Sequence, residues 1–134
     1  METITMQEIC KLKKELQKTK QNLKKEWTDQ ETEKVEKSIR EWLSNLTFSA
    51  RTRRGINSTE CFLPPLKTEE QMNNLLGLAY TSSSEYAGLW VCNVELIVKY
   101  DGERYFVQGF AMDTNNIYAV CHDEKENDYY IIIN

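Results

Sequence analysis

Three arginines within four residues are the strongest chemical signal in the chain. They lie in the segment Arg51-Thr52-Arg53-Arg54-Gly55. Guanidinium groups bind phosphate and carboxylate oxygens through paired hydrogen bonds, and a following glycine lets backbone amides approach an anion. The segment therefore predicts an anion site. The alternatives are ion pairs with an acidic part of the protein, or a charged edge that prevents strand-to-strand aggregation.

A predicted β-hairpin places two more cations opposite each other. Asp101-Gly102 is typical of a two-residue hairpin turn, and it sets the register of strands 89–100 and 103–112. Like charges directly opposite are unfavourable unless an anion lies over them. The pairs expected on this face are Lys99 with Arg104, Ile97 with Phe106, Glu95 with Gln108 and Asn93 with Phe110.

This face mixes aromatic and polar side chains and is predicted to bind a ligand, although helices covering its apolar residues would also explain it. The opposite face is the predicted core. Its residues are Trp90, Cys92, Val94, Leu96, Val98, Tyr100, Tyr105, Val107 and Gly109.

We expect a site in which cations hold phosphates and an aromatic ring, Phe106 or Tyr80, stacks on a base. A small anionic nucleotide fits such a site. A long nucleic acid does not, because the sequence pI is about 5.1. The expected ligand-binding residues are Arg51, Arg53, Arg54, Tyr80, Asn93, Lys99, Arg104 and Phe106.

Catalytic signatures are not found in the sequence. The single histidine, His122, follows Cys121, and neighbours on a strand point to opposite faces, so they cannot easily act as a nucleophile and base. The four cysteines lack metal-ligand spacing, and no phosphate-binding glycine motif occurs. We predict no enzyme activity, no metal and no cofactor, and we interpret the acidic run 123–128 as a solvated turn.

The charge of the chain is divided by position. Residues 1–54 carry 13 Lys/Arg against 9 Asp/Glu, a net of +4, whereas residues 55–134 carry 4 against 12, a net of −8. Such asymmetry favours self-association in opposite-charge register or an anionic ligand near the basic part.

Residues 1–46 are predicted to form a helical hairpin. Capping boxes at Thr5 and Thr28 would start the two helices. The first has a narrow apolar seam, which could pack on the β domain of the same chain or on the same helices of another subunit. The second alternative predicts a homo-oligomer, a dimer or higher. The seam residues are Ile9, Leu12, Leu16 and Leu23, and the second helix is expected to bury Val35, Ile39, Trp42 and Leu43.

Residues 47–134 are predicted to form an antiparallel β-rich domain with one short helix at 69–76, capped by Thr68 with Gln71 and ended by Gly77. Other strands are expected at 45–53, 59–63, 117–121 and 129–133, and residues 81–84 are expected to be a loop. The predicted fold class is α+β: an N-terminal helical hairpin packed on or beside a small antiparallel β-meander domain, in one folding unit.

The N-terminus lacks the features of a signal peptide, and no apolar run is long enough for a membrane span, so a cytoplasmic protein without a membrane partner is predicted. In layout, with two N-terminal helices, a small sheet domain and the Arg51–Arg54 cluster near the junction, the chain resembles the Thoeris anti-defence family of phage proteins. That resemblance implies a non-enzymatic protein in the host cytoplasm that sequesters a cyclic ADP-ribose-type immune signal at sites between subunits.

Two functions are therefore expected from the sequence. The first is sequestration of an anionic nucleotide signal. The alternative is a protein-binding inhibitor or immunity protein, similar in outline to small anti-CRISPR proteins, that acts through its acidic sheet surface.

Overall fold

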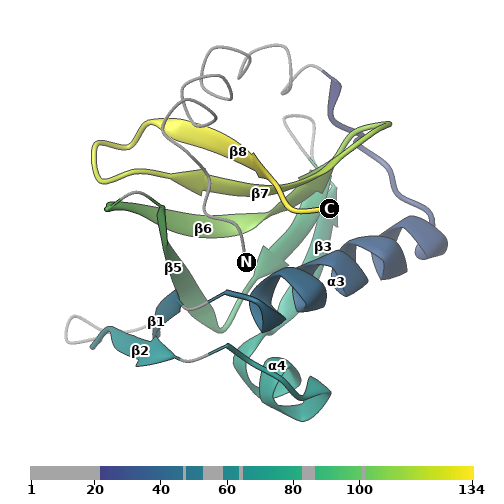
Figure 1. The fold of residues 1–134 in the computed structure, drawn as a ribbon. Helices are drawn as coiled ribbons and strands as arrows, with labels where there is room; N and C mark the ends of the chain where they lie inside the picture. Colours follow the sequence, from purple (N-terminus) through teal and green to yellow (C-terminus); the bar gives the residue numbers. More distant parts are fainter. Residues whose placement is uncertain (1–21, 47, 53–58, 64, 83–86, 101) are drawn as a thin grey trace.

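The computed structural model describes residues 22–46, 48–52, 59–63, 65–82, 87–100 and 102–134. Within them the chain forms two helices and eight strands (Figure 1). In chain order these are α3 (Asp29–Ser44), β1 (Phe48–Thr52), β2 (Cys61–Leu63), α4 (Glu69–Leu75), β3 (Leu78–Ser82), β4 (Ala87–Val91), β5 (Val94–Tyr100), β6 (Glu103–Met112), β7 (Ile117–His122) and β8 (Asp128–Ile132).

All eight strands belong to one antiparallel sheet, in which β6 is the shared strand. The order is β2-β1-β5-β6-β4-β3, and β7 followed by β8 continues from β6. One edge of β6 pairs with β7. The other edge pairs first with β5 and then, at Gly109 and Phe110, with β4. Strands β4 and β5 therefore lie end to end along one long strand.

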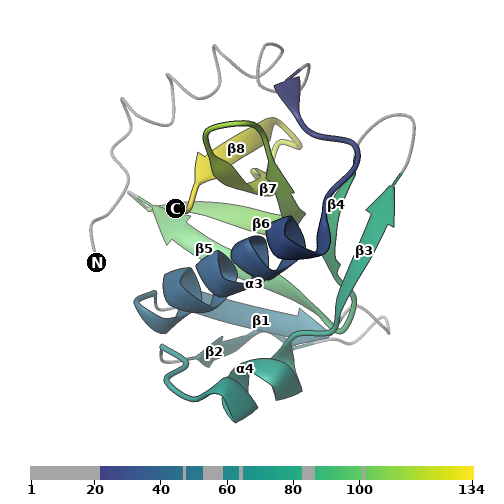
Figure 2. The same ribbon diagram turned by 90° about the vertical axis from the view of Figure 1, so that its right-hand side faces the viewer.

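Helix α3 packs on one face of this sheet, which we call the inner face (Figure 2). Its residues Val35, Ile39 and Leu43 are fully buried, and they recur every four residues, so they form one stripe along the helix. The rings of Trp42 and Phe110 meet edge to face at 6.2 Å between centroids. Helix and sheet thus share one hydrophobic core.

The predicted fold class is wrong. The described residues form a mostly sheet domain with eight antiparallel strands, rather than a helical hairpin beside a small meander. The second predicted helix exists as α3, but its apolar stripe packs on the sheet of the same chain. The first predicted helix and its seam residues Ile9, Leu12 and Leu16 lie outside the described residues, so the predicted oligomer stays a prediction.

Two of the predicted helix starts are confirmed. Thr28 and Glu31 form a capping box at α3, and Thr68 and Gln71 form one at α4, so each helix start satisfies two otherwise unpaired backbone amides. The predicted C-terminal role of Gly77 is not found, because α4 ends at Leu75 and its C-cap residue Leu76 is extended.

The predicted strand 89–100 is interrupted. It breaks at Cys92 and Asn93 into β4 and β5, and this break reverses the side-chain alternation. Trp90 and Cys92, predicted in the core, are therefore not core residues, and Cys92 is exposed. Phe110 pairs with Leu89 instead of Asn93. The predicted loop 81–84 begins as strand, because β3 extends to Ser82 and pairs with β4.

A β-bulge between Val107 and Gly109 changes which side chains of β6 reach the core. Tyr105 and Val107 point inward before it, and Phe110 and Met112 point inward after it. Gly109 lies directly beneath the Trp90 ring, where an added Cβ would stand 2.0 Å from a ring carbon. Only glycine leaves room for this ring on the sheet.

A smaller apolar cluster lies outside the main core. Leu23 packs with Ala111, Tyr118 and Tyr130, and the backbone amide of Lys24 donates to the Met112 carbonyl at 2.8 Å. This segment ties the chain before α3 to the end of β6. Neither described helix has the length and apolar character that a membrane crossing requires.

Candidate functional site

A continuous cross-strand row crosses the face of the sheet opposite α3, which we call the outer face. The register of five neighbouring strand pairs aligns its members, which run from β2 to β8: Phe62, Ser49, Ile97, Phe106, His122 and Asp128. Ile97 is buried in this row, whereas Phe62 at one end is 72% exposed. The row supplies aromatic surface between flanking charged residues.

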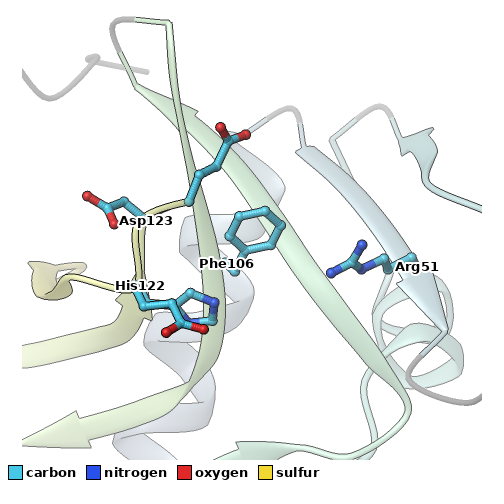
Figure 3. A pocket seen from close by; sticks show the side chains of 6 residues that line it. Arg51, Phe106, His122 and Asp123 are labelled. Atoms are coloured by element: carbon cyan, nitrogen blue, oxygen red, sulfur yellow. The ribbon is translucent and has the colours of Figure 1, made fainter.

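Phe106 is the centre of this row (Figure 3). The His122 ring stacks on it at 5.3 Å between centroids with an interplanar angle of 18°. The guanidinium carbons of Arg51 and Arg104 lie 5.5 Å and 5.3 Å from the ring centroid, within the range of cation–π attraction. Gln108 Nε2 lies 3.0 Å from His122 Nδ1 and fixes the orientation of the imidazole.

Both arginines are already bound by carboxylates. Arg51 donates from Nε and Nη2 to Glu95 Oε1, at 2.6 Å and 2.5 Å. Arg104 lies 2.5 Å from Glu60 through Nη2 and 3.5 Å from Glu124 through Nη1. A phosphate ligand would therefore compete with these carboxylates for the guanidinium donors.

A shallow pocket of about 320 Å³ opens beside Phe106. Figure 3 shows Phe106 between Arg51 on one side and His122 with Asp123 on the other. The lining residues are Arg51, Phe106, His122, Asp123, Glu124 and Glu126.

The acidic wall of the pocket is a rigid turn between β7 and β8. Asp123 accepts hydrogen bonds from the backbone amides of Lys125 and Asn127 and from the Asn127 side chain and Tyr129 hydroxyl. Burial raises the pKa of Asp123, but these donors outweigh burial and lower it below its ordinary value. Glu126 adopts φ of 65°, a left-handed conformation that a non-glycine residue rarely takes.

The described charges around Phe106 leave an excess of carboxylates. Four cations, Arg51, Lys99, Arg104 and Lys125, stand against six carboxylates, which is two negative charges in excess when His122 is left out of the count. The carboxylates are those of Glu60, Glu95, Asp123, Glu124, Glu126 and Asp128. The site as described favours a cation over an anion.

Half of the expected ligand-binding residues meet at this site. Arg51 and Arg104 flank Phe106, and Lys99 opposes Arg104 on β5 as expected. Arg53 and Arg54 lie outside the described residues.

The structure does not bring Tyr80 or Asn93 to Phe106. Tyr80 shares the strand face of the core residue Leu78, and its ring contacts Trp27 at 5.2 Å between centroids. Asn93 lies in the break between β4 and β5, where its side chain occupies the space beside Gly77.

The contribution of His122 and the turn after it was not predicted from the sequence. Without a bulge, a turn at 113–116 would place His122 opposite Val107, on the core face; the bulge places it opposite Phe106 instead. A signal was present. Tyr105 and Val107 are spaced for one face, but Phe110 and Met112 are spaced for the other, and this switch in apolar alternation indicates a bulge.

Cys121 and His122 are not arranged as a nucleophile and its base. Cys121 points to the core, opposite Val107, and burial raises the pKa of its thiol, while His122 faces outward. Among the described residues, no group of His, Cys, Asp and Glu is arranged to hold a metal ion.

No family model, curated protein or solved structure matches this chain.

Proposed function

We propose that this protein acts by binding a basic surface of a partner protein through the outer face around Phe106, in the manner of an inhibitor or immunity protein. The observation that carries the proposal is the charge state of the site: Arg51 and Arg104 are paired with carboxylates, and further carboxylates remain at the pocket. An acidic surface with this composition attracts a basic protein and repels polyanions.

The layout of the face also suits a protein partner. Phe62 and Phe106 lie in one cross-strand row, and charged side chains flank that row. Aromatic anchors surrounded by a charged rim are typical of protein interfaces. The face is built on strands, so it is presented without a large ordering cost on binding.

Binding without catalysis is part of the proposal. His122 is the single histidine of the chain, and its ring is engaged by Phe106 and Gln108. Cys121, its sequence neighbour, is buried on the opposite face. A Cys–His pair at this position is therefore disfavoured.

A second candidate is sequestration of an anionic nucleotide, the function implied by the resemblance to the Thoeris anti-defence family. Phe106 with two guanidinium groups beside it favours this candidate, because a base can stack and phosphates can bind arginine. The phosphates would compete with Glu60 and Glu95 for the arginine donors, and the excess of carboxylates opposes this binding.

A capture experiment tests the first candidate. The immobilised full chain is incubated with a lysate of the organism that encodes it, alongside a variant with Glu124→Lys and Glu126→Lys. The matched control carries Glu33→Lys and Glu41→Lys, two exposed positions on α3 that change the net charge equally. A basic protein retained by the wild type and the control, lost with the outer-face variant and rebound after purification supports the proposal.

Thermal shift measurements separate the second candidate from the first. Cyclic ADP-ribose isomers, cyclic dinucleotides and inorganic phosphate are added to the wild type and to Arg104→Ala. Nucleotide sequestration would be supported by two results together. A nucleotide would raise the melting temperature of the wild type but not of Arg104→Ala, and protein capture would be unchanged by Glu124→Lys and Glu126→Lys.

We place this function in the cytoplasm. Cys61 and Cys92 are exposed free thiols, which are best preserved in a reducing compartment.

A further inference from the structure

One wall of the pocket beside Phe106 is acidic. Within the described part of the chain, Glu124 makes only a long contact to Arg104 at 3.5 Å, and its side chain is 61% exposed. Glu126 is exposed, and no described cation pairs with it. Two carboxylates thus face a cavity whose other walls are the stacked pair of Phe106 and His122 and the Arg51 side chain, whose charge is paired with Glu95.

The protein's own arginines show how a guanidinium fits this chemistry. Arg51 and Arg104 each lie against Phe106 while a carboxylate holds the guanidinium nitrogens. Contact with an aromatic ring combined with hydrogen bonds to a carboxylate is the arrangement that a planar guanidinium favours. The same two elements, aromatic and carboxylate, line the pocket.

We infer that the pocket receives an arginine side chain of the partner protein, with its guanidinium between the aromatic pair and the carboxylates of Glu124 and Glu126. This inference rests on the proposed function and specifies its recognition element. Arginine is favoured over lysine because the compact, strongly hydrated ammonium gains less from a flat aromatic wall. A phosphate is disfavoured because it would face both carboxylates at short range.

The turn that carries the two glutamates is pre-organised for this role. Asp123 holds it through backbone amides on both sides of Glu126, namely those of Lys125 and Asn127. The carboxylates therefore need little ordering when a cation arrives, which reduces the free-energy cost of binding.

The test uses the ¹⁵N-labelled full chain and N-acetyl-L-arginine methylamide as the probe, followed by amide NMR at low ionic strength. The neutral isostere N-acetyl-L-citrulline methylamide and the lysine analogue are titrated in parallel. We expect shifts centred on residues 122–127 and Phe106, with a dissociation constant in the millimolar range, and none with citrulline. Glu126→Gln should weaken binding roughly threefold, as expected for an exposed ion pair. Phe106→Leu should weaken it independently, and Glu41→Gln on α3 should not.

Equal shifts with citrulline, tighter binding of the lysine analogue, or no shift up to about 100 mM probe, far weaker than a millimolar site, would each overturn the inference. If the probe fails but the outer face still captures a basic protein, only the arginine pocket is wrong. If the probe binds but protein capture does not depend on the outer-face charges, the arginine pocket is supported and the proposed function is wrong.

Discussion

The two faces of the sheet differ in chemistry although the same strands form both. The inner face is apolar and sealed by α3, with Val35 and Ile39 fully buried. The outer face around Phe106 keeps paired charges and an open pocket. Burial of apolar surface contributes most of the folding free energy, whereas exposed ion pairs contribute little. The outer face can therefore be changed by selection for binding while the inner face holds the fold.

The largest effect should come from the inner face. Ile39→Ala removes three carbons at a fully buried position between helix and sheet and should lower the free energy of unfolding by about 3 kcal/mol. Urea denaturation monitored by tryptophan fluorescence measures it. Phe106→Leu on the outer face should cost less than about 1 kcal/mol, because Phe106 is only partly buried. Equal losses from the two substitutions would remove the contrast between the faces.

The next largest effect on stability should come from two glycines of the sheet, Gly88 and Gly109. A Cβ at Gly88 would stand 2.3 Å from the Phe110 carbonyl oxygen, and a Cβ at Gly109 would meet the Trp90 ring. Both Gly88→Ala and Gly109→Ala should destabilise the fold, by about 2 kcal/mol.

Trp90→Ala separates the two cases. In the Trp90→Ala background, Gly109→Ala should lower the free energy of unfolding much less, because the ring that its Cβ would meet is absent. Gly88→Ala should lower it by the same amount as before, because its Cβ would still meet the Phe110 carbonyl oxygen. A double-mutant cycle by denaturation measures the coupling. Additive effects at Gly109 and Trp90 would show that the ring does not seal this part of the sheet.

A smaller, pH-dependent effect should come from the two aspartate turns beside β7. Asp113 accepts from the amides of Asn115 and Asn116 and from the Tyr118 hydroxyl, as Asp123 does in its own turn. Burial raises the pKa of Asp113, yet these hydrogen bonds lower it overall, below the ordinary value of 3.8. The stabilisation is thus complete above pH 3.8 and is lost as the pH falls through the folded-state pKa.

Asp113→Asn and Asp123→Asn should each destabilise by about 1 kcal/mol at pH 7, because the amide keeps an acceptor but loses the charge. The difference from the wild type should shrink in denaturation curves at pH 3. An equal difference in the free energy of unfolding at pH 7 and pH 3 would mean that the carboxylate charge does not stabilise these turns.

The smallest effect should come from the arginines beside Phe106. Arg51→Gln and Arg104→Gln should each change stability by about 0.5 kcal/mol, because both ion pairs are open to solvent. Lys99→Gln, at an exposed neighbour, is the matched control. A loss of several kcal/mol from either arginine would make the outer face part of the structural core.

Local sequence signals predicted the elements whose determinants are adjacent in the chain. The bounds of β6 and the pairing of Lys99 with Arg104 are confirmed, because the turn signals at 101–102 and 113–116 lie directly beside the strand in the sequence. The capping boxes at Thr28 and Thr68 are confirmed for the same reason.

The rest depends on contacts between distant residues. Thr81 and Ser82 at the end of β3 are strand because β4 offers them backbone partners, although their sequence alone favours a loop. The break at Cys92 and Asn93 arises because β4 and β5 share one edge of β6. At the site, Arg51 and Arg104 were identified as cations, but their carboxylate partners Glu95 and Glu60 come from other strands or loops, so the sign of the site could not be predicted.

The central position of β6 has a consequence for the order in which the molecule forms. Since β4, β5 and β7 all depend on it for hydrogen bonds, its amides should be the last to exchange with deuterium in the native state. Yet β6 begins only at residue 103, so a chain emerging from the ribosome has already released α3 and strands β1 to β5 before the strand that joins them exists. Until β6 is synthesised, the apolar stripe of α3 and the edges of β4 and β5 that later pair with β6 are exposed. A chaperone is therefore most able to bind the chain during this interval.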